Sequence, residues 1–351
     1  MPSEPVGLPI DYGGPVDRPF EPFPYWVLEG SVIDRFYGVA RRFPERLAVQ
    51  DLTCCLTYCE LAALVDRIAA VTTTATAQSA GPVAILLKSE ARFPAAMLGV
   101  LAAGRGYVPL DADQPMVRNQ LIAQQAGAAA LISADDLADQ ARALFSKDVP
   151  VIDLQRLDQF PAIKTSHRSK PDDVAYIAYT SGSTGVPKGV YRNHRSLLHD
   201  ILQYTNALHL NCEDRLALVF SPSVVVATHD IYSALLNGGS LYIMPPHDLS
   251  PAALGQKLRS DRITILNVAP TLFRHIARTL GPGELFNSLR IVKLSTDRSS
   301  WSDVDEFRRV CPADSFLYLA LGSSECAIHL HWFVDDSVRP TSNQLPAGRA
   351  I

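Results

Sequence analysis

Residues 179–190 contain the residue types that proteins use to hold a polyphosphate. They read YTSGSTGVPKGV, and the apolar or aromatic residues 175–178 before them predict a buried strand that runs into a loop. Small residues fill this loop, namely Ser181, Gly182, Ser183, Thr184, Gly185 and Gly189. Glycines let the backbone approach a ligand and turn its N–H groups inward, hydroxyl groups add donors, and Lys188 adds a full positive charge. We therefore expect this segment to bind phosphate groups.

The loop differs from a Walker A motif, which uses the same residue types in the order Gly, any four residues, then Gly-Lys-Ser/Thr. Counting from Gly182, the position of the second glycine holds Pro187, and the Ser/Thr position holds Gly189. Both required positions fail. The residues as they stand resemble instead the phosphate loop of the adenylate-forming superfamily. That superfamily contains the adenylation domains of nonribosomal peptide synthetases, acyl- and aryl-CoA ligases, and luciferases.

Four other segments extend the resemblance over nearly the whole chain. Residues 56–61 (LTYCEL) match the family's Thr-Tyr-x-Glu-Leu motif, and residues 101–111 (LAAGRGYVPLD) match a second motif that is usually interpreted as structural. Residues 321–325 (LGSSE) stand where the family has Tyr-Gly-Pro-Thr-Glu, and residues 345–349 (LPAGR) are similar to the Pro-x-Gly-Arg stretch that follows it.

The resemblance implies a two-step reaction. A carboxylate attacks the α-phosphorus of ATP to give an acyl-adenylate and pyrophosphate, and a thiol then takes the acyl group. Lys188 would hold the β- and γ-phosphates together with the loop residues Thr180, Ser181, Gly182, Ser183, Thr184 and Gly185. Ser324, in place of the family threonine, would bond the α-phosphate, and Glu325 would carry Mg²⁺, a hard cation that prefers carboxylate oxygen. Without the neighbouring motif, Glu325 would be read as an exposed carboxylate at a helix end.

The adenine pocket departs from the family pattern. The segment that ends in Ser295, Thr296 and Asp297 aligns with a strand that ends in Gly-Gly-Glu in the family, so two glycines are replaced by bulkier residues. These side chains would crowd a purine or hydrogen-bond to it. Leu321, next to Gly322, also replaces the tyrosine that usually stacks on adenine, which removes an aromatic contact.

The acid pocket departs as well, because Val225 stands where members that activate amino acids carry an aspartate. A valine cannot compensate the buried α-ammonium of an amino acid, so we expect another kind of acid. The other expected lining residues are Val226, His229, Asn267, Lys293, Ser295, Ala320, Ile328 and His329.

Lys293 has two readings at the sequence level. Its side chain either extends to the surface or is aimed into the pocket, where His229 and His329 could join it. In the second case the acid would carry a second anionic or strongly polar group, unless a neighbour such as Asp230 or Asp297 balances the charge. A zinc site at His329 and His331 is a further alternative.

Strand and helix signals alternate along the chain, which predicts an α/β fold of two stacked, mostly parallel lobes, with the family's small C-terminal domain absent. Thr57 and Glu60 form a capping box that predicts a helix start. We expect an irregular N-terminal arm at 1–30 and an AMP-binding core at 31–351, with one lobe at about 31–160, a second at about 171–330 and the start of a third β subdomain at about 331–351.

Composition sets the remaining bounds. The chain has 351 residues, a net charge of −4 and no block of like charges, so neither nucleic acid nor a membrane surface is indicated as a partner. The proline-rich first thirty residues contain no apolar run of signal-peptide length. Six cysteines without a Cys-x-x-Cys pair suggest small, buried, reduced thiols more than a metal site, and a cytoplasmic location.

Three functions remain open at this point. The first is the core of an ATP- and Mg²⁺-dependent ligase that transfers the acyl group to the phosphopantetheine thiol of a carrier protein. The second is a free-standing acyl- or aryl-CoA ligase, and the third is a degenerate scaffold that only binds a partner. Because the family's C-terminal domain carries a catalytic lysine that does not lie in these residues, we expect the chain alone to be slow or inactive.

Overall fold

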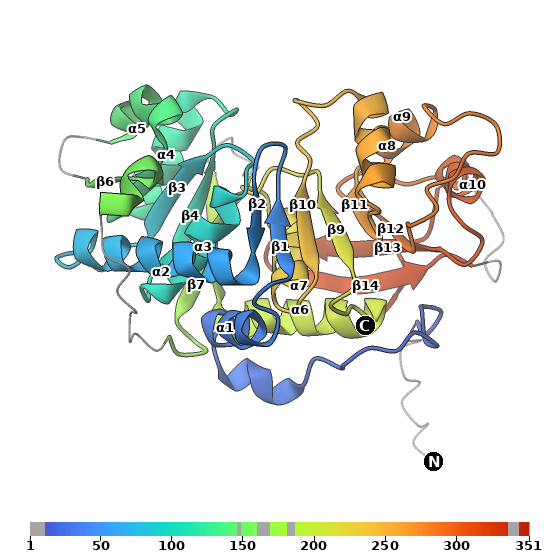
Figure 1. Cartoon of the computed structure of the whole chain (residues 1–351), viewed down its shortest axis with the longest axis horizontal. Coiled ribbons are helices and arrows are strands. Elements are labelled where there is room, and N and C mark those ends of the chain that lie inside the picture. The colour runs from blue at the N-terminus through green and yellow to red at the C-terminus, as the bar shows by residue number, and fades with distance from the viewer. Residues whose placement is uncertain (1–10, 146–148, 160–168, 181–186, 336–343, 351) are drawn as a thin grey trace, which may run out of the picture.

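The computed structural model describes residues 11–145, 149–159, 169–180, 187–335 and 344–350. In this part of the chain the strands form one nine-stranded and one six-stranded sheet (Figure 1). The larger sheet has the order β15-β14-β13-β12-β11-β9-β10-β1-β2. Its strands are β1 (Leu47–Gln50), β2 (Cys55–Thr57), β9 (Arg215–Leu218), β10 (Ser240–Ile243), β11 (Ile265–Val268), β12 (Ile291–Leu294), β13 (Phe316–Ser323), β14 (Ala327–Phe333) and β15 (Arg349–Ala350). Only β2, β14 and β15 pair in the antiparallel sense.

The smaller sheet has the order β6-β5-β3-β4-β7-β8. Its strands are β3 (Val83–Leu87), β4 (Tyr107–Asp111), β5 (Ala130–Ser133), β6 (Val151–Asp153), β7 (Val174–Thr180) and β8 (Lys188–Asn193). All pairs are parallel except β7 with β8. The inner strands are continuous apolar runs, as expected for strands that helices cover on both faces.

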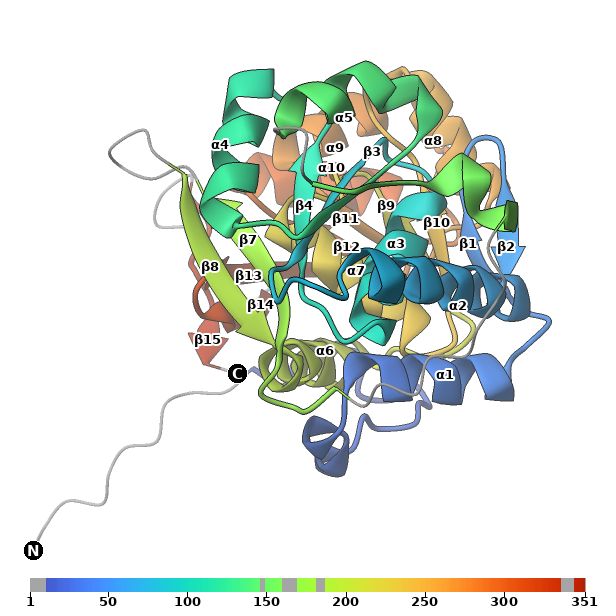
Figure 2. The same ribbon diagram turned by 90° about the vertical axis from the view of Figure 1, so that its left-hand side faces the viewer.

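Helices form three layers around and between the two sheets (Figures 1 and 2). The central layer lies in the largest apolar core and contains α2 (Tyr58–Ala75), α3 (Arg92–Ala102), α6 (His194–Leu208) and α7 (Val225–Leu235), with α1 (Val32–Arg42) at its edge. A second core lies under α8 (Pro251–Ser260), α9 (Pro270–Ala277) and α10 (Trp301–Val310) on the outer face of the larger sheet. A third lies under α4 (Met116–Ala126) and α5 (Ala138–Leu144) on the outer face of the smaller sheet. Short 3-10 helices are η1 (Tyr25–Glu29), η2 (Asp135–Leu137) and η3 (Leu154–Gln159).

The expected two mostly parallel α/β lobes are confirmed, and so is the capping box at the start of α2. The hydroxyl of Thr57 accepts a hydrogen bond from the backbone N–H of Glu60, whose carboxylate accepts the backbone N–H of Thr57 in return. No helix of the described residues is long and apolar enough to cross a membrane. The expectation of buried thiols holds only for Cys311, because Cys54, Cys55, Cys59 and Cys326 are exposed and Cys212 is half-buried.

The division of the chain between the lobes differs from the expected one. Strands β1 and β2 belong to the larger sheet although they precede residue 160, and β7 and β8 belong to the smaller sheet although they follow residue 171. The chain therefore crosses between the lobes more than once. Alternation of strands and helices predicts the elements but does not say which sheet a strand joins, and this is why a single boundary was wrong. Residues 331–333 and 349–350 likewise extend the edge of the larger sheet.

The described part of the N-terminal arm is fastened to the larger lobe. Asp11 accepts a hydrogen bond from the backbone N–H of Phe333 at 2.6 Å, and Arg18 pairs with the buried Asp214 at 3.1 Å. Arg290 binds the same carboxylate with two hydrogen bonds of 2.8 Å. The arm also contains η1, which the expectation of an irregular segment over residues 1–30 did not include.

Candidate active site

The hairpin of β7 and β8 carries the expected phosphate loop. Thr180 lies opposite Lys188 in this antiparallel pair, so the two ends of the loop are held side by side. Thr180 is half-buried and Lys188 is exposed. The remaining expected phosphate-binding residues lie outside the described residues, namely Ser181, Gly182, Ser183, Thr184 and Gly185. Their role stays a prediction, but the hairpin fixes where the lysine is anchored.

A second hairpin, between β13 and β14, carries Ser324 and Glu325. Glu325 is exposed and Ser324 is half-buried. The turn is tight: a Cβ at Gly322 would collide with the carbonyl oxygen of Ala327, and Ala327 itself has φ of 56°. This close approach is a reason for glycine at position 322, independent of any ligand.

Arg192 connects the two hairpins, and the sequence reasoning did not single it out. It lies on β8 four residues after Lys188, is buried, and donates from Nη1 to the carbonyl oxygen of Glu325 at 3.3 Å. Its Nη2 forms an ion pair with Asp200 on α6. Burial raises the pKa of the Asp200 carboxyl to about 6, although Arg192 lowers it. Both hairpins lie on the same side of the molecule (Figure 2), and Arg192 holds them together.

A cavity of about 480 Å³ lies beyond the carboxyl ends of β12 and β13. It is lined by Leu294, Thr296, Asp297, Arg298, Ser299, Leu319, Ala320, Leu321, Gly322, Leu345, Pro346 and Ala347. The structure thus brings together most of the residues expected around adenine, from two segments about 25 residues apart. Crevices at the carboxyl ends of parallel strands are the usual ligand sites of such sheets.

The two residues that replace the family glycines behave differently. Ser295 does not line this cavity, because its side chain is buried and its Oγ donates to Asn267 at 2.7 Å. The expectation that Ser295 crowds the purine is therefore wrong. Thr296 does line the cavity and has φ of 72°, in the left-handed region that disfavours a β-branched residue. Leu321 is 45% exposed and lines the same cavity, so an aliphatic side chain stands where the family has tyrosine.

A buried polar row crosses the larger sheet beside this cavity. Asn267, Lys293 and Tyr318 are direct neighbours in register on β11, β12 and β13. All three are buried, and α7 covers them with His229 and Asp230. Most of the residues expected to line the acid pocket are therefore in or next to one cluster.

Lys293 is only 2% exposed, so the surface reading of this residue is wrong. Its Nζ lies 4.8 Å from the ring centroid of Tyr204 on α6, a cation–π contact. Asp230 provides the counter-charge and accepts two hydrogen bonds from Nδ2 of Asn267, at 3.0 and 3.2 Å. Burial lowers the pKa of Lys293 to about 8, which Asp230 opposes, and raises the pKa of Asp230 to about 7, which Lys293 opposes.

The histidines do not converge as expected. His229 is buried and its ring stacks on Tyr204 at 5.6 Å; burial and the charge of Lys293 hold its pKa well below the usual value, so the ring is neutral. His329 is exposed and lies outside the cluster. His331 is buried, and its ring nitrogens contact the hydroxyl of Tyr318 and the carbonyl oxygen of Asp11, both at 3.3 Å. Its two neighbours are thus protein groups, and no group of three metal-ligating side chains occurs among the described residues.

One small cavity lies on the acid side. It measures about 10 Å³ and is lined by Asp200, Gln203, Tyr204, His229, Tyr318 and Ile328. This volume accommodates about one water molecule. Of the apolar residues expected in the pocket, Ile328 lines this cavity, whereas Val225, Val226 and Ala320 are half-buried and do not line it.

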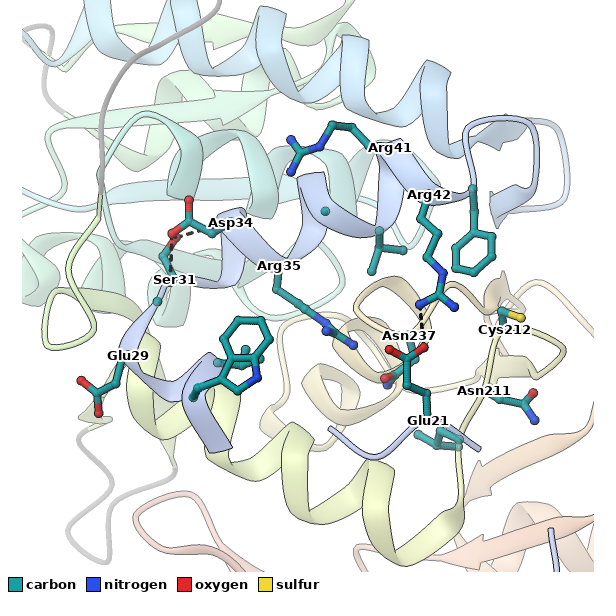
Figure 3. Close-up of a pocket in the computed structure, with 17 residues that line it drawn as sticks. Glu21, Glu29, Ser31, Asp34, Arg35, Arg41, Arg42, Asn211, Cys212 and Asn237 are labelled. Carbon is teal, nitrogen blue, oxygen red and sulfur yellow. Dashed lines mark hydrogen bonds and ion pairs between the residues drawn. The ribbon is translucent and has the colours of Figure 1, made fainter. Parts of the chain in front are cut away.

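Another hollow lies away from these residues, between α1, η1 and residues 210–212 (Figure 3). It measures about 810 Å³, and Trp26 at its side is 74% exposed. Its acidic groups already have partners: Glu21 pairs with Arg42 at 2.6 Å, and Asp34 accepts hydrogen bonds from Ser31 in a capping box. None of the residues expected to act on ATP or the acid lies there.

Comparisons with known proteins agree with the geometry. The family described as "AMP-binding enzyme" matches residues 36–351. Pyochelin synthetase PchE of Pseudomonas aeruginosa is 33% identical over 259 residues, which cover 73% of this chain and 18% of that protein. The nonribosomal peptide synthetase FmoA3 superposes with a TM-score of 0.84 at 24% identity, covering 93% of this chain and 36% of that chain.

A third similar protein is closer in size. The N-terminal subdomain of Klebsiella oxytoca NpsA, solved in complex with 3-hydroxyanthranilyl-AMSN, has a TM-score of 0.75 at 25% identity and covers 92% of this chain and 79% of that chain. The curated relatives are much longer: this chain spans 18% of PchE and 29% of tyrocidine synthase 1 from Brevibacillus parabrevis.

Proposed function

Because the chain belongs to the AMP-binding enzyme family, we propose that it is the N-terminal core of a nonribosomal peptide synthetase adenylation domain. It would use ATP to convert a carboxylic acid into an acyl-adenylate, for transfer to the phosphopantetheine thiol of a carrier protein. The observation that carries the proposal is the joint position of three features. The hairpins of Lys188 and Glu325 are tied by Arg192, and a cavity of about 480 Å³ lies where β13 leads into the second hairpin.

In-line displacement at phosphorus needs positioning and charge stabilisation more than covalent help from the protein. Lys188 would place its ammonium against the transferring phosphates, and its exposure leaves it free to do so. Glu325 has an exposed carboxylate that fits a Mg²⁺ ligand. Mg²⁺ would neutralise charge on the phosphate oxygens when bound. Ser324, half-buried next to Glu325, would donate to the α-phosphate.

The acid is proposed to lack an α-ammonium group. Val225 offers no counter-charge at the position where amino-acid-activating relatives have aspartate. The buried ammonium of Lys293 would also repel a second cation in the same pocket. Among the described residues here, the carboxylate of Asp230 already balances Lys293 and is held by Asn267, and Asp200 at the adjoining small cavity is paired with Arg192. An incoming ammonium would therefore stay uncompensated.

Calorimetric titration of the chain with ATP and Mg²⁺ tests the nucleotide part. That the NpsA N-terminal subdomain was solved with a ligand supports testing this chain by itself. We expect binding, and a loss of about 10- to 100-fold in affinity in Lys188→Ala, the range for a hydrogen bond to a charged group. Lys170→Ala removes another exposed lysine and is the matched control. Absence of binding in the unmodified chain would favour the scaffold reading.

A hydroxamate-trapping screen with the full-length enzyme tests the acid part. The panel contains amino acids, hydroxy and keto acids, aryl acids and dicarboxylates. Preferential activation of a standard α-amino acid would contradict the proposal. Comparing a carrier protein with CoA as the acceptor in the same assay separates a synthetase module from a free-standing CoA ligase.

A further inference from the structure

Two buried polar side-chain atoms in the acid-side cluster have no hydrogen-bond partner among the described residues. They are Tyr204 Oη and His229 Nδ1. The ammonium of Lys293, on a side chain that is 2% exposed, lies beside them at 4.8 Å from the ring centroid of Tyr204. Leaving such groups unpaired costs free energy, so their common location indicates a missing ligand group.

The charge of the cluster limits what this ligand group can be. Asp230 is the counter-charge of Lys293, and Asp200, which lines the adjoining small cavity, pairs with Arg192, so these four groups are neutral as a whole. A second carboxylate in the ligand would place two anions against one ammonium in a site closed to water, and a ligand ammonium would meet Lys293 without a free anion. The ligand group must therefore be uncharged. It must also accept hydrogen bonds, because an ammonium can only donate.

The space left sets its size. Tyr204, His229, Tyr318 and Ile328 are among the residues around a cavity of about 10 Å³, which is the volume of a single water-sized group. His229 and Ile328 are also two of the positions expected to line the acid pocket. The end of the acyl group that reaches this point is thus no larger than a hydroxyl or carbonyl group.

We infer that the acid activated here carries one uncharged oxygen function, a hydroxyl or carbonyl group, which accepts a hydrogen bond from Lys293 beside Tyr204 and His229. The inference rests on the proposed function, since it names the substrate class of the same site. It decides between the two kinds of second group that the sequence left open for the acid, in favour of a polar neutral group over an anionic one.

Calorimetry with non-hydrolysable acyl-sulfamoyl adenosines tests the inference on the chain itself. Matched pairs differ only by a hydroxyl and a methyl group: 2-hydroxybutanoyl against 2-methylbutanoyl, and 3-hydroxybutanoyl against 3-methylbutanoyl. We add 2-aminobutanoyl and succinyl compounds for the cationic and anionic classes. In at least one pair the hydroxyl compound should bind about 10- to 100-fold more tightly than its methyl partner, and more tightly than both charged compounds.

Two variants show whether the named groups cause this preference. The double variant Lys293→Met with Asp230→Asn removes the ammonium without leaving a buried carboxylate unpaired, so it should fold, and the hydroxyl-to-methyl ratio should fall to about one. Tyr204→Phe removes only one hydroxyl and should lower the ratio by less, about three- to tenfold. A ratio unchanged in both variants would overturn the assignment to these residues.

The outcomes separate the two proposals. If the hydroxyl and methyl compounds bind equally well, the substrate class is wrong while the adenylate-binding function stands. If the succinyl or amino compound binds most tightly, the charge argument is wrong and the class changes accordingly. If neither these compounds nor ATP binds, the proposed function itself fails and the inference falls with it.

Discussion

The two sides of the candidate site differ in how far their polar side chains are exposed to water. On the nucleotide side Lys188 and Glu325 are exposed on the two hairpins, and Thr296, Asp297 and Leu321 are exposed at the cavity of about 480 Å³. On the acid side Asn267, Lys293, Tyr318, His229 and Asp230 are all buried, and the cavity that Tyr318 and His229 line measures about 10 Å³. Exposed charges contribute little to stability, whereas buried charges must be paired. Changes on the nucleotide side should therefore affect ligands, and changes on the acid side should also affect folding.

The largest effect is expected from Lys293→Met. It leaves the buried Asp230 carboxylate without its counter-charge, which should lower the free energy of unfolding by about 3–5 kcal/mol near pH 7.5, between the pKa values of the two groups. The loss should be smaller at pH 6. A carboxyl group whose folded-state pKa is raised contributes its full stability below the unfolded value, near 4, and loses it as the pH rises through the folded value. That value is about 7 with Lys293 present and higher without it.

Urea unfolding at the two pH values measures this difference. The double variant with Asp230→Asn is the control, because it has no carboxylate to titrate and its deficit should not depend on pH in this way. Equal deficits of Lys293→Met at pH 6 and pH 7.5 would show that Asp230 and Lys293 do not interact, and the contrast between the two sides would lose its main support.

Arg192→Met tests the link between the hairpins. Asp200 would lose its counter-charge while its side chain is only 9% exposed, and we expect a loss of about 2–3 kcal/mol in the free energy of unfolding. The backbone around Glu325 would also lose its tie to β8, so amide hydrogen exchange in the turn between β13 and β14 should become faster. Arg195→Met is the matched control, because Arg195 pairs with Glu29 and Asp172 at the surface and its removal should change little. Unchanged exchange in the turn would contradict the positioning role.

Thr296→Gly should stabilise the protein by about 0.5–1 kcal/mol. The left-handed backbone at this position costs a β-branched residue about 1–2 kcal/mol. Glycine also has more conformational freedom in the unfolded chain, which reduces the expected stabilisation. Thr296→Ala keeps a Cβ in the same conformation and should give little or none of this gain. Thermal unfolding of the three proteins measures the differences. A Thr296→Gly variant less stable than its parent would mean that other contacts of the side chain outweigh the strain.

Leu321→Tyr should affect only ligand binding, and only modestly. An aromatic ring at this exposed position would stack on adenine and contribute about 0.5–1.5 kcal/mol, a few-fold increase in affinity for ATP in calorimetry. Stability should not change. Unaltered affinity would mean that the cavity of about 480 Å³ does not hold adenine next to residue 321.

Much of the fold could be predicted from local patterns. The alternating strand and helix signals predicted the α/β layers, and the capping box of Thr57 and Glu60 marks the start of α2. Strand β8 was missed, because Lys188, Tyr191 and Arg192 interrupt any apolar alternation. It exists because its backbone pairs with β7, and such pairing between segments leaves little trace in one segment's own sequence.

The sequence by itself determined the helices, the inner strands, the phosphate-binding motif and the absence of an acidic partner at Val225, because these depend on residue types at fixed short spacings. The tertiary structure alone decided that β1 belongs to the larger sheet and β7 to the smaller one. It also decided that Arg192 reaches Glu325, that Asp230 balances Lys293, and that His329 lies apart from His229. Each of these depends on side chains from different elements meeting in space. Whether a charged side chain is buried or paired depends on which elements pack against it, and the sequence of one segment does not specify this.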